Sequence, residues 1–153
     1  MPYPYIENDA AYNINAPVKF PEKRRELLYL LSADQKELKK LSLSIRNTKP
    51  ESKKILEIKE VAIKCQQRSD RVLEIIDEIV EPSIGNVGRE GSEAIVILTM
   101  HSYVEAMKKV LYIYQAIFKD RPNDIAGYMI PMLIDRVMVL EKRRQSLVLI
   151  GFH

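Results

Sequence analysis

The fold of this chain depends on one glycine-punctuated stretch, Val87-Gly88-Arg89-Glu90-Gly91-Ser92-Glu93-Ala94, which runs on into an apolar segment. Its glycines permit positive φ and close backbone approach, and Ser92 followed by an acidic residue is typical of a helix N-terminus. The stretch predicts a turn that opens a long helix over residues 92–118, with His101 within the apolar stripe. A glycine loop before a helix can bind an anion, but the spacing matches no nucleotide-binding loop and no strand precedes it.

Three further segments show apolar residues at helical spacing and end at residues that stop helices. They predict helices from Pro21 to about residue 46, over residues 51–80, and from about residue 122 to residue 143, where Pro131 either kinks the helix or starts a new turn. No segment alternates as a strand would. The sequence therefore predicts an all-α fold, an up-down bundle of four main helices.

Two segments lie outside the four predicted helices. Residues 1–20 are rich in proline and tyrosine, which predicts an extended N-terminal arm, either a tail packed on the domain or a lid or dimer arm. The apolar segment Leu147–Ile150 predicts a short C-terminal element that closes the bundle. We expect the arm (residues 1–20) and one bundle domain (residues 21–153).

Composition excludes several classes of protein. A chain of 153 residues with 46% apolar and 29% charged residues is typical of one soluble domain. The net charge of +3 is mild and the basic residues are scattered, so we expect no nucleic-acid partner. A single cysteine excludes an intrachain disulfide, and neither a signal peptide nor a membrane-spanning run is present, so we expect a cytoplasmic protein without a membrane partner.

Polar residues interrupt all four apolar stripes near the middle of the predicted helices. Since midpoints of helices in an up-down bundle lie at one level, we expect these residues to meet in one layer. They are Asp34 and Gln35, then Cys65, Arg68 and Ser69, then His101, and finally Asp135 and Arg136.

Two interpretations of this layer remain open. In one, it lines a pocket for a small molecule, where His101 acts as acid or base, Asp135 or Asp34 orients it, and Arg136 holds an anionic group. In the other, the layer is a satisfied buried network that fixes helix register, and the protein is a non-catalytic module for a protein partner or for homo-oligomerisation.

Metal and thiol chemistry receive less support from the residues. His101 and Glu105 are spaced as a possible ligand pair, but the duplicated Glu-x-x-His motif of di-iron bundles is absent, so we expect no metal and no cofactor. Cys65 on an apolar stripe is typical of inert packing.

The order of the short motifs resembles a family of uncharacterised bacterial all-helical domains of unknown function. The matching residues, between about residues 22 and 153, are Asp34-Gln35, the stretch from Val87 to Ala94, His101, Leu133-Ile134-Asp135-Arg136-Val137 and Gln145. The resemblance implies a shared polar site that includes Asp34, Gln35 and Gln145 as ligand contacts. The chain departs from the pattern at Met100, Cys65, Arg68 and its C-terminal residues, which implies an altered site.

Overall fold

The structure is a computed structural model that describes residues 17–149. Within them lie five α-helices, two short 3-10 helices and no strand, so the prediction of an all-α fold is confirmed. The α-helices are α1 (Pro21–Ile45), α2 (Glu51–Ile79), α3 (Ile84–Met100), α4 (Val104–Asp120) and α5 (Ile130–Leu149), and the 3-10 helices are η2 (Pro122–Asp124) and η3 (Gly127–Met129). The N-terminal arm over residues 1–16, and residue 150 of the C-terminal element, lie outside the described residues.

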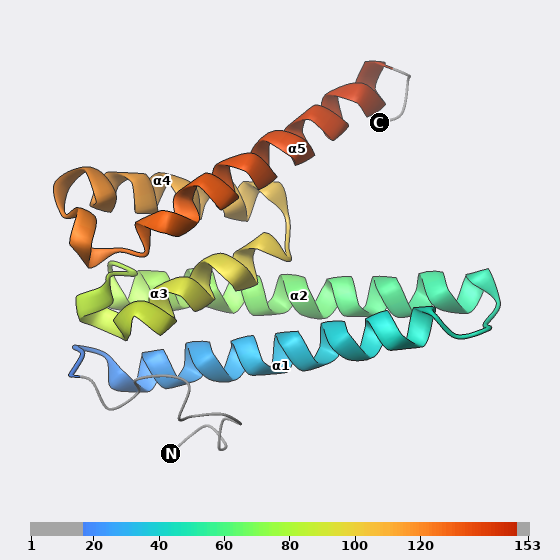
Figure 1. Cartoon of the computed structure of the whole chain (residues 1–153), viewed down its shortest axis with the longest axis horizontal. Coiled ribbons are helices and arrows are strands. Elements are labelled where there is room, and N and C mark those ends of the chain that lie inside the picture. Colours follow the sequence, from blue (N-terminus) through green and yellow to red (C-terminus); the bar gives the residue numbers. More distant parts are fainter. Residues whose placement is uncertain (1–16, 150–153) are drawn as a thin grey trace.

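The long helices α1 and α2 run antiparallel as a hairpin, and the shorter helices cover only one end of it (Figure 1). Helix α3 packs against both hairpin helices, and α4 and α5 pack against each other on the other side of α3. Helix α5 then leads away from the hairpin (Figure 1). The predicted helices over residues 21–46 and 51–80 agree closely with α1 and α2.

The predicted helix over residues 92–118 is wrong, because two helices occupy this part of the chain. Helix α3 ends at Met100 and α4 begins at Val104, with a turn between them in which the Ser102 amide donates to the Thr99 carbonyl at 3.1 Å. Immediately before α4, the Tyr103 hydroxyl donates a hydrogen bond to Asp70 of α2 at 3.0 Å. The turn therefore places His101 at a helix end rather than inside a helix.

The glycine stretch is mostly helical, which corrects the predicted loop. Ser83 caps α3 by accepting a hydrogen bond from the Asn86 amide at 3.3 Å, so the predicted N-cap Ser92 is wrong. One residue interrupts the helix: Gly88 has φ 79° and ψ 166°, a conformation that essentially only glycine adopts. Ser92 is instead buried inside α3, where its carbonyl accepts the Tyr114 hydroxyl at 2.5 Å.

The segment before α5 folds as two 3-10 turns instead of a continuous helix. Gly127 leaves room there for the Phe118 ring, since a Cβ would lie 2.6 Å from that ring and displace it. Pro131 is the second residue of α5, where its missing amide costs no hydrogen bond, so the expected new turn at this proline is confirmed. Residues 147–149 continue α5 and form no separate element.

The apolar core lies where the shorter helices cover the hairpin. Helix α1 contributes buried side chains only up to Asp34, and α2 contributes them only from Cys65 onward. The largest fully buried side chains are Leu27, Leu28, Val72, Ile75, Ile79, Val87, Ile95, Leu98, Met107, Tyr114 and Leu133. Between Asp34 and Cys65 no side chain is buried. We call residues 35–64 the hairpin tip.

Candidate functional site

A cluster of polar side chains joins α1, α2 and the end of α3 where the core meets the hairpin tip. Its centre is Asp34, whose side chain is 1% exposed. One carboxylate oxygen, Oδ2, lies 2.6 Å from Nδ1 of His101, and the other, Oδ1, accepts Nε–H of Arg68 at 3.1 Å. A buried carboxylate with two such partners avoids most of the cost of burying an unpaired charge.

Arg68 extends the cluster along the seam between the two hairpin helices. Its guanidinium donates to Glu37 at 2.7 Å, and the other oxygen of Glu37 lies 3.2 Å from Nζ of Lys64. Burial raises the pKa of Glu37, but the hydrogen bonds from Arg68 and Lys64 outweigh it and hold the pKa below its usual value. Glu37 is therefore ionised at neutral pH and bridges two cations of α2.

Cys65 lies beside this cluster as a neutral thiol. Its sulfur is 3.7 Å from Oδ1 of Asp34, and the residue is 4% exposed. Burial raises the pKa of the thiol, and the neighbouring Asp34 carboxylate raises it further, although Arg68 opposes them. Because the thiolate is the nucleophile, a raised pKa makes Cys65 unreactive, in keeping with the predicted packing role.

His101 is the member of the cluster that faces outward. It follows the last residue of α3, and its side chain is 28% exposed. Its Nδ1 contacts Asp34. The other ring nitrogen, Nε2, has no hydrogen-bond partner within residues 17–149. A carboxylate that fixes one nitrogen and leaves the second accessible is an arrangement that can support proton transfer. It can equally serve to anchor the end of α3 to α1.

The other predicted site residues lie elsewhere. Gln35 is exposed beside Asp34, and Asp135, Arg136 and Gln145 are exposed on α5. The expectation that Asp135 and Arg136 join the buried layer is therefore wrong. Its physical cause is the turn after Met100, which separates α4 and α5 from the hairpin. Of the six predicted site residues, the structure brings together Asp34 and His101.

Ser69, predicted in the layer, is fully buried, and its hydroxyl has no hydrogen-bond partner in the described part of the chain. Two members of the cluster were missed by the sequence analysis, Glu37 and Lys64. The signal was present: Lys64 and Arg68 lie one turn apart on α2, a spacing that presents two cations to one carboxylate on a neighbouring helix.

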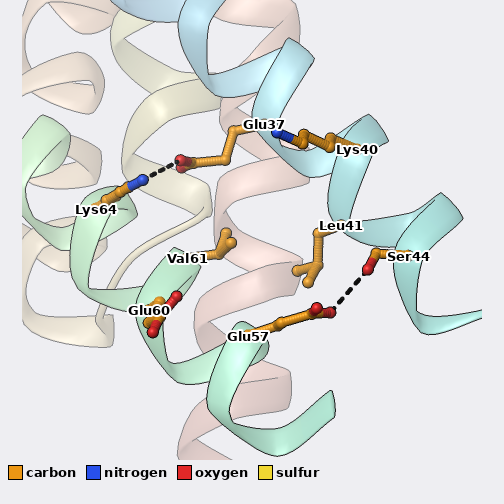
Figure 2. A pocket seen from close by; sticks show the side chains of 8 residues that line it. All are labelled: Glu37, Lys40, Leu41, Ser44, Glu57, Glu60, Val61 and Lys64. Carbon is orange, nitrogen blue, oxygen red and sulfur yellow. Dashed lines mark hydrogen bonds and ion pairs between the residues drawn. The ribbon is translucent and has the colours of Figure 1, made fainter. Parts of the chain in front are cut away.

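A cleft of about 210 Å³ lies further along the same seam, inside the hairpin tip. Its lining comes equally from α1 and α2 and mixes both charges with apolar side chains (Figure 2): Glu37, Lys40, Leu41, Ser44, Glu57, Glu60, Val61 and Lys64. Glu57 accepts hydrogen bonds from Ser44 at 2.9 Å and from Lys49 at 2.8 Å. Because Glu37 and Glu57 already pair with hydroxyl, guanidinium or ammonium groups of the chain, the seam serves to hold the two helices together.

The surface of the hairpin tip is both apolar and basic. Five large apolar side chains each expose between 46% and 57% of their surface: Leu43, Ile55, Leu56, Ile58 and Ile63. The tip carries nine Lys and Arg residues against four Glu, whereas the net charge of the whole chain is only +3. The positive charge of the protein is therefore concentrated in the tip.

In residues 17–149 no three His, Cys, Asp or Glu side chains are grouped so that they could hold a metal ion. No helix in this range combines the length and the apolar character needed to cross a membrane. Comparisons of the chain with models of protein families, with curated proteins and with solved structures find no match.

Proposed function

We propose that this protein is a binding module that engages another protein through the hairpin tip. The observation that carries the proposal is that residues 35–64 bury no side chain, yet hold five large apolar side chains that are about half exposed. Single exposed apolar residues are normal on a protein surface. Several in one projecting element are typical of an interaction site.

The hairpin tip is preformed, which suits it for binding. Two contacts on its seam join α1 to α2 beyond the core: the ion pair of Glu37 with Lys64, and the hydrogen bond from Ser44 to Glu57. Lys49 of the connecting loop also pairs with Glu57. A partner therefore meets two helices already in place and loses little free energy to ordering them. Helical pairs of this kind commonly bind a further helix along their apolar face.

Site-specific photo-crosslinking in the native cell tests this proposal. A photoreactive residue replaces Ile58 in the tip or, as a control, Tyr112, which is 75% exposed on α4. We expect a discrete partner to crosslink from position 58 and not from position 112. The purified partner should then bind the wild-type protein and bind the Ile58→Asp variant at least about tenfold more weakly, as interface anchors do.

A matched variant separates loss of binding from loss of folding. Met138→Asp alters an exposed apolar residue of α5 outside the tip and should bind the partner like the wild type. Both substitutions lie at exposed positions, so each should change the free energy of unfolding by less than about 1 kcal/mol. Equal crosslinking from both positions, or equal binding by Ile58→Asp and the wild type, contradicts the proposal.

Proton transfer at His101 is a second candidate function, and one observation favours it. The Nδ1–Oδ2 distance of 2.6 Å to a buried carboxylate fixes the ring while leaving it partly exposed. A test is to add small carboxylates and phosphates to the protein in turn and to follow the ¹⁵N signal of His101 Nε2. A shift of the Nε2 signal in the wild type that other surface signals do not share supports the function. A panel that leaves the Nε2 signal unchanged counts against it.

A further inference from the structure

The face of the hairpin that α3 covers continues, uncovered, along the tip. On α1, Leu27 lies against Gly91 of α3, since a Cβ on that glycine would be 3.7 Å from it. Leu38 and Ile45, both half-buried, lie on the same stripe, because they follow Leu27 by 11 and 18 residues, which make about three and five turns of helix. We call Leu38, Ile45, Ile58 and Ala62 the extended α3 face.

The α2 side of this face follows from the same periodicity. Cys65 and Ser69 are buried at the level where α3 ends. Ile58 and Ala62 precede them by two turns and therefore point to the same side of α2. Yet Ile58 is 46% exposed and Ala62 is exposed as well. Figure 1 shows why: α3 stops part of the way along the hairpin, and α1 and α2 continue to their connecting loop.

The uncovered face has the dimensions of a short helix. From Asp34, level with the end of α3, to Ile45 the distance along α1 is about 16 Å at 1.5 Å per residue. This length accommodates about three turns of a docked helix.

The rims of the face are basic. An exposed cation directly follows three of the face residues: Lys39 follows Leu38, Arg46 follows Ile45 and Lys59 follows Ile58. None of the three forms an ion pair within residues 17–149. The residue that follows a face position lies about 100° around the helix, and on both helices this rotation leads away from the seam, so the three cations flank the apolar face.

The acidic residues of the tip do not balance these cations. Three of the four acidic residues of the tip lie at the seam: Glu37 and Glu57 are held there by Lys64 and Lys49, and Glu60 lines the cleft with them (Figure 2). The fourth, Glu51, is exposed in the first turn of α2, two turns before Ile58, so one carboxylate at the end of the face stands against the three rim cations. None of the cleft residues belongs to the extended α3 face. A second copy of this chain is a poor occupant, because two tips with nine basic and four acidic residues each would repel one another.

We infer that the extended α3 face binds an amphipathic helix with acidic flanks, supplied by another protein. The inference rests on the proposed function and names its partner by charge and shape. Apolar side chains of that helix lie on Leu38, Ile45 and Ile58, and its carboxylates face the rim cations. This is helix-in-groove recognition with charge complementarity at the rim.

Two synthetic peptides of roughly four turns test the inference. Both carry the same leucine stripe at helical spacing; one has glutamate flanks and the other has lysine flanks. Fluorescence anisotropy should show that the full-length protein binds the acidic peptide at least about tenfold more tightly than the basic one, and that added salt reduces the difference.

Paired variants locate the binding face. Ile58→Asp should weaken acidic-peptide binding at least about tenfold, whereas Leu56→Asp should not, because Leu56 precedes Ile58 by two positions and points to the opposite side of α2. The double variant Lys39→Glu/Lys59→Glu should weaken binding at least about threefold. Lys109→Glu, an exposed position on α4, makes the same kind of charge change away from the tip and should have no effect.

Several outcomes overturn the inference and leave the proposed function to its own crosslinking test. They are equal binding of the two peptides, no binding of the acidic peptide, or a larger loss in Leu56→Asp than in Ile58→Asp. Sedimentation that shows a dimer lost in Ile58→Asp also overturns it, because a second copy would then occupy the face. If the crosslinking experiment succeeds while the peptide experiment fails, only the stated partner chemistry is wrong.

Discussion

Asp34 on α1 and His101 at the end of α3 are 67 positions apart in the chain, and their side chains meet with 2.6 Å between Oδ2 and Nδ1. The pair lies at the boundary between two parts of the molecule. On one side, α1 and α2 are covered by α3 and share the apolar core; on the other, they project as the hairpin tip. The contact thus marks where α3 ends and the uncovered face begins.

Removing the carboxylate at this boundary should be costly. Asp34→Ala leaves Arg68, whose side chain is only 12% exposed, without one of its two carboxylate partners, and it frees the end of α3. We expect the free energy of unfolding to fall by about 2–4 kcal/mol, measured by urea denaturation. Gln35→Ala, at the exposed neighbouring position, should change it by less than about 0.5 kcal/mol. Similar values for the two variants would show that the cluster contributes little.

The kink in α3 provides a test of backbone strain. Gly88→Ala places a Cβ at φ 79°, only 3.2 Å from Cδ of Arg24, and should destabilise the protein by about 1–3 kcal/mol. Gly85→Ala is the matched control, since that glycine has no positive φ and its Cβ would meet Asp124 at an ordinary 3.5 Å. Thermal unfolding of both variants checks the prediction, and equal midpoints would contradict it.

Acid should weaken the seam through Glu37. Its pKa in the folded protein lies below the usual 4.5, so its ionised form stabilises the fold at higher pH. This contribution is complete above the unfolded-state pKa and is lost as the pH falls through the folded-state pKa. Between about pH 5 and pH 3, the wild type should lose more stability than Glu37→Gln. Urea midpoints across this range measure the difference, and parallel curves for the two proteins would exclude Glu37 as the cause.

Cys65 should resist alkylation in the native protein. Burial raises the pKa of its thiol and limits access to the sulfur. At pH 8 we expect iodoacetamide to react at least about tenfold more slowly with the folded chain than with the urea-unfolded chain, as followed by mass spectrometry. Equal rates would mean that the boundary between core and tip opens readily.

The hairpin was readable from the sequence because its ends are set locally. Pro21 begins α1, Pro50 precedes α2, and apolar residues recur at helical spacing between them. The sequence also predicted that Asp34 lies at the same level of the bundle as Cys65 and Arg68, and this holds because α1 and α2 run antiparallel. Their contacts within 3.7 Å follow from that arrangement.

The turn after Met100 could not be read in the same way. It contains neither proline nor glycine, and the apolar stripe continues across it from α3 into α4. Contacts with distant residues accompany the break, because His101 contacts Asp34 and Tyr103 donates to Asp70. Local periodicity carries no information about such partners, and the positions of Asp135 and Arg136 were wrong for the same reason.

The absence of buried side chains between Asp34 and Cys65 has a consequence for how this protein can evolve. Substitutions in a core are constrained by packing, but those on the exposed surface of the tip leave the core intact. The surface of the tip can therefore diverge rapidly while the fold is inherited unchanged. Relatives should therefore differ most in their tips.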